Sequence, residues 1–304
     1  MPSLLRLGTR GSKLALIQAR ETADRLARAH PALAAPDAVE IVPIVTTGDS
    51  VQNRLLSEIG GKGLFTKEID EALLAGRIDI AVHSMKDLPT ALPDGTVIGA
   101  VLPREDPRDA LIGAARLADL PQGATLGTAS LRRSAQARSL RPDLVVVPLR
   151  GNVDTRLRKI AAGEAKATLL AVAGLKRLGM LDQVGGALEP EEMLPSVAQG
   201  AIAVACRTGD ARVLAWLAAL DDRPSRLRVT AERALLEVLD GSCRTPIAGL
   251  AEIAGDTLRL RGLVASVDGR RVDRAERSGP AADAEAIGRD LGSALKTATL
   301  KSGP

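Results

Sequence analysis

The stretch IDIAVHSMKDLP, residues 78–89, joins an apolar segment directly to a group of polar side chains. The run from Ile78 to Val82 predicts a short strand in the core of a sheet. In open α/β sheets, ligands bind in the crevice beyond the carboxyl ends of the strands. We therefore expect Asp87, a carboxylate next to the ammonium of Lys86, to take part in chemistry. The alternative is that Lys86 and Asp87 form a solvated pair in a surface turn.

The composition is that of a globular protein with more than one domain. A chain of 304 residues is long enough for two or three domains, each with its own core. Hydrophobic residues make up 45% and charged residues 26%, but there is no Tyr, one Phe and one Trp. The cores must therefore be built from Leu, Ile, Val and Ala, and aromatic stacking on nucleic-acid bases is nearly unavailable.

The charged residues and the cysteines restrict the possible functions. The formal net charge is +4, yet no basic tract of a nucleic-acid-binding module is present, and scattered arginines suit a small polyanion better. Two cysteines and two histidines provide neither a disulfide framework nor a zinc site of the usual spacing, so we expect no metal. The N-terminal residues lack the pattern of a signal peptide, and no run of 18 apolar residues occurs. We expect a cytoplasmic protein.

The first part of the chain predicts an α/β unit with an anion site. Residues 4–7 form an expected strand, and residues 13–29 an expected amphipathic helix with Ser12 as its N-cap. Arg10 lies in the turn between them, where free N–H groups and the helix dipole favour a negative charge. An ordinary strand-to-helix turn without a ligand is the alternative interpretation.

The same unit is expected to continue to residue 101. Residues 39–45 and 97–101 are predicted strands, and residues 64–74 a predicted helix. Lys62 lies in a glycine-rich loop, residues 60–63, that is typical of a lid. This loop lacks the GxxxxGK[ST] pattern, so a nucleotide-binding interpretation is weak.

A second α/β unit repeats the pattern after the proline- and charge-rich segment 103–108. Predicted strands at residues 125–127, 144–149 and 168–172 are each followed by a turn or helix start, where several arginines stand. Those we single out are Arg132, Arg133, Arg150 and Arg156. Two lobes that present such residues to one cleft would form a cationic pocket.

The last third of the chain predicts a return strand and then a small α+β domain. Residues 195–206 contain the return strand, residues 207–220 a helix and residues 221–225 a linker. Beyond it we expect a helix at 230–239, antiparallel strands within 250–267, a hairpin turn at 267–270 and a final helix at 283–297.

The two cysteines lie in contrasting surroundings. Cys243 stands in a Gly-Ser-Cys loop beside Arg244, where a reactive thiolate would be favoured. Composition alone leaves open whether Cys243 is functional. Cys206 lies in an apolar run and is expected to be a buried, inert side chain.

Taken together, the motifs resemble the porphobilinogen deaminase family over nearly the whole chain. The matching stretches are TRGSKLAL (9–16), GGKGLFTKE (60–68), HSMKDLP (83–89), REDPRDA (104–110), GTASLRR (127–133), LRGNVDTRL (149–157), LAVAGLKRLG (170–179), LPSVAQGA (194–201) and the cysteine loop (241–246). Two positions depart from the family pattern. Glu58 stands where some relatives have a lysine, and Ser242 stands where many have a glycine.

The resemblance implies an α/β fold with two lobes like those of periplasmic binding proteins, each with a mixed sheet, and a small C-terminal α+β domain. The implied first lobe comprises residues 1–102 and 199–220 and carries the catalytic aspartate and the lid. The second lobe comprises residues 103–198 and is rich in arginine. The third domain, residues 221–304, carries the cofactor cysteine.

The resemblance also implies the reaction. Four porphobilinogen molecules are joined head to tail with loss of ammonia, and the product hydroxymethylbilane is then released by hydrolysis for tetrapyrrole biosynthesis. A dipyrromethane cofactor primes the chain through a thioether to Cys243, and Asp87 is the implied catalytic residue. The implied cofactor-binding residues are Lys86, Asp87, Ser130, Arg132 and Arg133. The implied substrate-binding residues are Arg10, Ser12, Lys62, Phe65, Arg150, Arg156 and Gln199.

Other function classes are less well supported. A non-catalytic two-lobed binding protein for a small polycarboxylate is the main alternative, because a fold does not fix a function. A nucleic-acid binder would show strongly salt-dependent DNA retention. A hydrolase lacks the GxSxG motif and has only His83 as a credible base. We expect a monomer whose partner is porphobilinogen, with no nucleic acid and no membrane.

Overall fold

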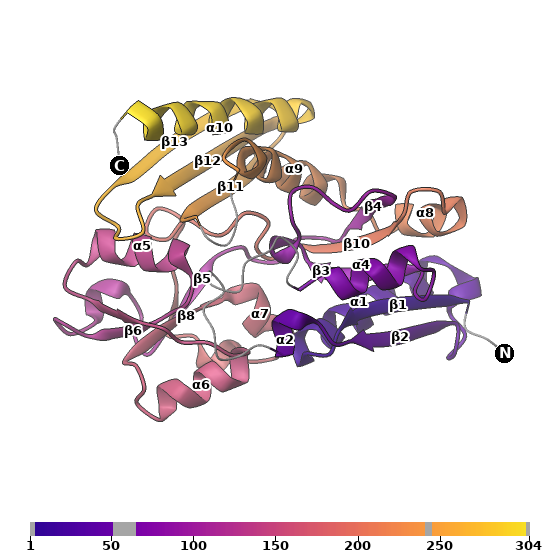
Figure 1. Cartoon of the computed structure of the whole chain (residues 1–304), viewed down its shortest axis with the longest axis horizontal. Coiled ribbons are helices and arrows are strands. Elements are labelled where there is room, and N and C mark those ends of the chain that lie inside the picture. The colour runs from indigo at the N-terminus through magenta and orange to yellow at the C-terminus, as the bar shows by residue number, and fades with distance from the viewer. Residues whose placement is uncertain (1–3, 51–64, 241–244, 302–304) are drawn as a thin grey trace. The chain divides into compact units, whose positions relative to one another are not determined.

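The computed structural model describes residues 4–50, 65–240 and 245–301, which form two compact units (Figure 1). Among the described residues, the first unit contains 4–50, 65–105 and 201–226, and the second contains 106–200, 227–240 and 245–301. The chain passes from the second unit back to the first between Gly200 and Ala201. Within the described residues, no helix is long and apolar enough to cross a membrane.

The first unit is a five-stranded mixed sheet covered by helices. Its strands are β1 (Leu5–Arg10), β2 (Val39–Ile44), β3 (Ile80–Ser84), β4 (Thr96–Val101) and β10 (Ile202–Arg207), in the spatial order β2-β1-β3-β10-β4. Strand β1 runs parallel to β2 and β3, whereas β10 runs antiparallel to β3 and β4. The helices are α1 (Lys13–Ala29), α2 (Thr47–Ser50), α4 (Lys67–Leu74) and α8 (Ala211–Ala218), with short 3₁₀ turns at η1 (Pro31–Leu33) and η2 (Met85–Asp87).

Local sequence explains where α1 begins and ends. The Ser12 hydroxyl accepts a hydrogen bond from the Ala15 N–H (3.3 Å), as expected of an N-cap. The buried positions Ala15, Ala19 and Leu26 recur at helical spacing and face the sheet. Pro31 follows the C-cap residue His30 and starts a new turn. The predicted bounds of this helix and its N-cap are confirmed.

The second unit contains a sheet of the same design. Strands β5 (Asp109–Ile112), β6 (Thr125–Gly127), β7 (Val145–Val147), β8 (Ala167–Ala171) and β9 (Gly186–Ala187) lie in the order β7-β6-β8-β5-β9. Strand β6 runs parallel to β7 and β8, and β5 runs antiparallel to β8 and β9. The helices are α5 (Leu131–Leu140), α6 (Val153–Ala161) and α7 (Val172–Arg177), with 3₁₀ turns η3 (Leu117–Asp119) and η4 (Leu181–Gln183).

The same unit also holds a three-stranded antiparallel sheet with two helices. Its strands are β11 (Ile247–Ala254), β12 (Thr257–Ala265) and β13 (Val272–Pro280), and its helices are α9 (Arg223–Val238) and α10 (Ala284–Lys301), with a 3₁₀ turn η5 (Ala281–Asp283). Figure 1 shows both helices against this sheet, where Leu235, Leu260 and Leu291 share a core. The predicted fold class is confirmed: two mixed α/β sheets and a small α+β portion.

Some sequence-based boundaries were wrong. Residues 221–225 were expected to be a linker, but α9 begins at Arg223 because Asp222 accepts a hydrogen bond from the Ser225 N–H (2.9 Å). Strand β5 was missed because it follows a segment of prolines and charges. Strand β13 was missed because polar residues such as Arg274 and Glu276 fill its exposed positions.

Candidate active site

The carboxyl ends of β1 and β3 meet at one edge of the first sheet because the two strands are parallel. Strand β1 ends at Arg10, and β3 ends at Ser84. The 3₁₀ turn η2 follows β3 directly and carries Lys86 and Asp87. The structure therefore brings Arg10, Lys86 and Asp87 to the same edge, as the sequence predicted for the end of this strand.

Buried neighbours fix the position of Asp87. Met85 and Leu88 are both buried, and the Met85 N–H donates a hydrogen bond to the Ala201 carbonyl (3.0 Å). Leu88 N–H in turn donates to the Met85 carbonyl (3.2 Å) and closes the turn. Lys86 and Asp87 are half-buried between these two anchors. The backbone of Lys86 and Asp87 is thus held in place, while their side chains remain partly exposed at the edge of the sheet.

Side chains near the carboxyl ends of β1 and β3 also contact one another. The Arg10 guanidinium lies over the ring of Phe65, 4.4 Å from its centroid, which is a cation–π arrangement. Ser84 exchanges two hydrogen bonds with the Gln18 amide, at 2.9 and 3.1 Å. Ser12 caps α1 at the same end of β1. Arg10, Ser12 and Phe65 thus lie at the same end of the first sheet.

His83 is the buried histidine of this edge. It is 5% exposed, and among the described residues its Nε2 has no hydrogen-bond partner. Burial, and then the nearby charge of Arg10, lower the pKa of His83 to about 4. His83 is therefore neutral near pH 7, which makes it a poor source of protons for a reaction at this edge.

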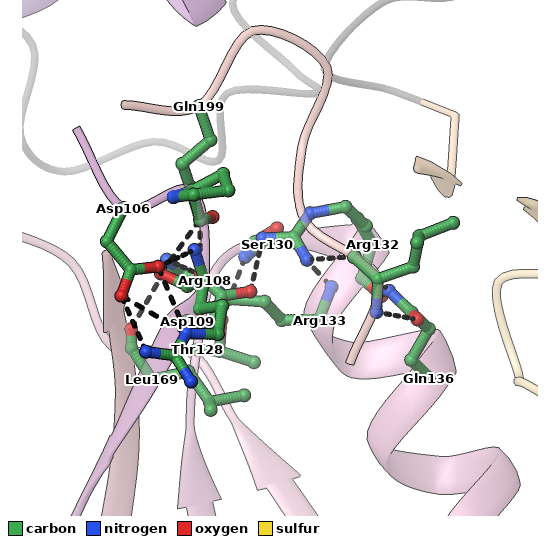
Figure 2. Close-up of polar contacts among 12 residues, drawn as sticks. Asp106, Arg108, Asp109, Thr128, Ser130, Arg132, Arg133, Gln136, Leu169 and Gln199 are labelled. Atoms are coloured by element: carbon green, nitrogen blue, oxygen red, sulfur yellow. Dashed lines mark hydrogen bonds and ion pairs between the residues drawn. The ribbon is translucent and has the colours of Figure 1, made fainter. Parts of the chain in front are cut away.

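The second unit holds a buried cluster around Asp109, the first residue of β5 (Figure 2). Arg133 donates to Asp109 Oδ1 from Nη2 (2.7 Å) and Nε (3.2 Å) and to the Leu169 carbonyl from Nη1 (2.8 Å). Arg132 Nη2 lies 2.8 Å from Asp109 Oδ2, and its Nη1 donates to the Leu194 carbonyl (2.8 Å). Gln199 Nε2 donates to Asp109 Oδ1 (2.9 Å).

The charges of this cluster compensate one another. Burial alone would raise the pKa of the Asp109 carboxyl, but the charges of Arg132 and Arg133 outweigh it and hold this pKa well below its usual range. Arg132 and Arg133 are each 6% exposed. Both arginines start α5, whose N-cap Ser130 accepts a hydrogen bond from the Arg133 N–H (3.4 Å).

Arg150 and Arg156 form a cationic pair without such compensation. Arg150 precedes α6, and Arg156 lies in its first turns, where its Nε donates to the Gly151 carbonyl (2.8 Å). Burial, and then the charges of Arg133 and Arg150, lower the pKa of Arg156 to about 10. Among the described residues, neither arginine of the pair forms an ion pair, and the buried Arg150 Nη1 has no hydrogen-bond partner. This is the arrangement that a carboxylate ligand would complete.

Two predicted site residues, Lys62 and Cys243, lie outside the described residues. Cys206 is described and is fully buried in β10. Burial, and then the charge of Asp210, raise the pKa of its thiol to about 11 against the opposing effect of Arg207. Its expected burial as a small hydrophobic side chain is confirmed.

Comparisons with known proteins agree with these observations. The family description "Porphobilinogen deaminase, dipyromethane cofactor binding domain" matches residues 5–215, and "Porphobilinogen deaminase, C-terminal domain" matches residues 226–297. The porphobilinogen deaminase of Paracoccus denitrificans (strain Pd 1222) is 62% identical over 294 residues, which cover 96% of this chain and 93% of that protein. The chain belongs to the porphobilinogen deaminase family.

Other similar proteins include a plant member of the porphobilinogen deaminase family. The protein named "Porphobilinogen deaminase, chloroplastic" in Oryza sativa subsp. japonica is 54% identical over 308 residues, covering 99% of this chain and 85% of the plant protein. Among solved structures, a TRAP periplasmic solute binding protein from Desulfovibrio salexigens is 11% identical, with a TM-score of 0.43 over 73% of this chain and 72% of the other.

Membership in the porphobilinogen deaminase family establishes the activity class. The chain is a hydroxymethylbilane synthase, a transferase of tetrapyrrole biosynthesis that carries a dipyrromethane cofactor. A non-catalytic binding protein, the main alternative from sequence, is therefore not supported.

Sequence reasoning missed Asp109 and Glu232, two fully buried carboxylates. Asp109 stands in the motif REDPRDA, where it is one of several acidic residues and nothing marks it as the partner of both arginines. Glu232 lies in the middle of α9, where its spacing is that of any helical residue. Neither could have been found without the fold.

Proposed function

We propose that the chain joins four porphobilinogen molecules head to tail, with loss of ammonia at each addition, and then releases hydroxymethylbilane by hydrolysis. The observation that carries this proposal is the cationic pair Arg150–Arg156. Each pyrrole of the product bears an acetate and a propionate, so the growing chain is a polycarboxylate. Guanidinium groups that lack ion-pair partners and are partly desolvated bind carboxylates strongly and in a defined orientation.

The described side chains fit a chain of pyrroles that bear carboxylates, such as the dipyrromethane and the substrate units added to it. The buried, unpartnered Arg150 Nη1 and the lowered pKa of Arg156 both point to a negatively charged partner in the second unit. When bound, the dipyrromethane supplies the free pyrrole carbon to which the new units are added. We propose that Cys243 holds it through a thioether, because a thiolate beside a cation is a good nucleophile.

We assign the chemical role to Asp87. A half-buried carboxylate held by Met85 and Leu88 can accept hydrogen bonds from pyrrole N–H groups and stabilise positive charge that develops on the substrate. It can also take up the proton that leaves the attacking pyrrole carbon once the new carbon–carbon bond has formed. Neutral His83 is not assigned a proton-transfer role, because its pKa is lowered to about 4.

We propose that the remaining predicted residues either bind carboxylates of the cofactor and substrate or position the side chains that bind them. Lys86, Ser130, Arg132 and Arg133 act on the cofactor, and Arg10, Ser12, Lys62, Phe65, Arg150, Arg156 and Gln199 act on the substrate units. Arg133 contributes chiefly its charge, since Nε, Nη1 and Nη2 already donate to Asp109 and Leu169.

Three further proposals concern organisation. The chain is divided into a first lobe (1–102 and 199–220), a second lobe (103–198) and a C-terminal domain (221–304), which limited proteolysis would test by cleavage near these boundaries. It acts as a monomer, which sedimentation would contradict if it gave twice the chain mass. It works in the cytoplasm, where cell fractionation should find the activity.

The decisive experiment compares the two cysteines. Protein from a host that makes porphobilinogen should carry a mass increment of two linked pyrrole units on the peptide with Cys243, and should give a colour with Ehrlich's reagent. Cys243→Ser should lose the increment, the colour and the activity. Cys206→Ser, at a buried site with a raised thiol pKa, should keep all three. An active preparation with unmodified Cys243 would refute the covalent primer.

A further inference from the structure

Glu232 of α9 is a fully buried carboxylate whose two oxygens accept backbone hydrogen bonds from two separate segments. The Ala198 N–H donates to Oε2 (2.6 Å), and the Ala251 N–H of β11 donates to Oε1 (2.8 Å). Hydrogen bonds to a charged acceptor in a low-dielectric interior are stronger than neutral ones. Glu232 therefore ties the segment around Ala198 to the helix and sheet of residues 227–301.

The segment that Glu232 holds has an unfavourable backbone conformation. Ala198 has φ 58°, in the left-handed region that side chains with a Cβ rarely adopt. Such a conformation persists only where surrounding contacts impose it. The bond from Ala198 N–H to Glu232 is one such contact, and it fixes the direction in which the next residue, Gln199, leaves the backbone.

Gln199 connects Ala198 to the buried cluster around Asp109. Its side chain is fully buried, and Nε2 donates to Asp109 Oδ1 (2.9 Å) and to the Pro107 carbonyl (2.8 Å). Asp109 Oδ1 also accepts from Arg133, and Oδ2 faces Arg132 (Figure 2). The contacts therefore run without a break from Glu232 through Ala198, Gln199 and Asp109 to the two arginines at the start of α5.

We propose that Glu232 is a positioning residue that sets the place of Arg132 and Arg133 through this buried relay. The relay comprises Glu232, the backbone of Ala198, Gln199 and Asp109. Glu232 touches neither arginine in the described contacts, so the relay is the route by which it would affect the binding of carboxylate ligands. The inference rests on the proposed function, since it assumes that these arginines hold the carboxylates of the cofactor to which the substrate units are added.

The first test measures the relay without any turnover. Glu232→Gln keeps the shape of the side chain but turns one acceptor into a donor, so that either Ala198 or Ala251 loses its partner. Hydrogen exchange of the peptide covering 196–201 should become about 10- to 100-fold faster. Unchanged exchange at Ala198 and Gln199 in this variant would overturn the proposal.

The second test is a double-mutant cycle on the KM for porphobilinogen. Glu232→Gln and Gln199→Met should each raise KM by about 3- to 10-fold, with a smaller change in kcat, because ligand positioning rather than chemistry is disturbed. In the double variant, Glu232→Gln should add nothing further, because the relay is already cut at Gln199. Multiplying effects would mean that the two residues act separately, and the relay would be wrong.

A matched control separates positioning from loss of stability. Leu291→Ala removes a buried side chain from the core that α9 shares with β12 and α10, away from the relay. It should lower the melting temperature yet leave KM and the exchange of 196–201 at wild-type values below the transition. If Leu291→Ala raised KM as Glu232→Gln does, general destabilisation would explain both. Failure of the wild-type chain to use porphobilinogen would refute the proposed function, whereas the exchange experiment would still decide the relay.

Discussion

At the scale of single residues, Asp87 is placed by its neighbours in the chain. Met85 and Leu88 bury the turn, so replacing the carboxyl by an amide should leave the fold intact. We predict that Asp87→Asn lowers turnover by at least about 10²- to 10⁴-fold, the usual effect of losing an acid–base group. Steady-state kinetics and a melting curve measure the two effects separately. Near-normal product formation by this variant would remove Asp87 from the mechanism.

The burial of His83 leads to a separate prediction, that the free energy of unfolding depends on pH. Its pKa is about 4 in the folded protein against 6.5 as the reference, so between these values the unfolded chain binds a proton that the folded chain does not. The free energy of unfolding therefore does not depend on His83 above pH 6.5. As the pH falls from 6.5 towards 4, protonation of His83 in the unfolded chain lowers this free energy by about 3 kcal/mol in total. The free energy of unfolding measured with urea should therefore be about 2 kcal/mol lower at pH 5 than at pH 7.

Two variants isolate the contribution of His83. His83→Gln should remove this part of the pH dependence, because the titrating group is gone. His30→Gln leaves His83 in place and should retain it. A wild-type stability that stays constant between pH 7 and pH 5 would show that His83 is not held neutral by burial.

At the scale of elements, the start of α6 and the start of α5 carry arginines in different electrostatic surroundings. Arg156 in α6 has no carboxylate partner among the described residues, whereas Arg133 in α5 is paired with Asp109. We predict that Arg156→Ala raises the KM for porphobilinogen about 10- to 100-fold with little change in melting temperature. Arg158→Ala on the exposed side of the same helix is the control and should stay within about twofold of wild type.

Arg133→Ala should behave differently. It leaves the fully buried Asp109 with one guanidinium fewer, and breaking a buried pair costs about 3–5 kcal/mol. The melting temperature should therefore fall clearly, in contrast to Arg156→Ala. Equal melting temperatures for the two variants would contradict the distinction between an arginine that also pairs with a buried carboxylate and one that does not.

At the scale of the whole molecule, the large apolar side chains that are exposed among the described residues lie on separate elements. Leu74 ends α4, Leu140 ends α5 and Val267 lies in the turn between β12 and β13. A stable dimer interface needs a larger continuous area. We predict a single species at the mass of one chain, 31.6 kDa plus the pyrrole increment, in sedimentation at micromolar concentration. Concentration-dependent doubling of the mass would contradict this.

The two lobes and their strand ends could be predicted from the sequence because the signals are local. Apolar runs such as 78–82 predict strands, Ser12 and Ser130 mark helix starts, and polar residues directly after a strand must lie at the edge of a sheet. Asp87, Arg150 and Arg156 were predicted as site residues in this way. The family motifs added the reaction and the cofactor, and they are the basis for proposing that Cys243 holds it.

Only the tertiary structure revealed which charges compensate one another. Asp109 and Arg133 are 24 residues apart in the sequence, and Glu232 reaches Ala198 across 34 residues. No local periodicity encodes such pairs, because the strand order β7-β6-β8-β5-β9 and the packing of α9 bring them together. The sequence by itself determined that cations stand at the helix starts, because that signal is local. Only the fold shows that Arg133 is paired with a buried carboxylate while, among the described residues, Arg150 and Arg156 are not.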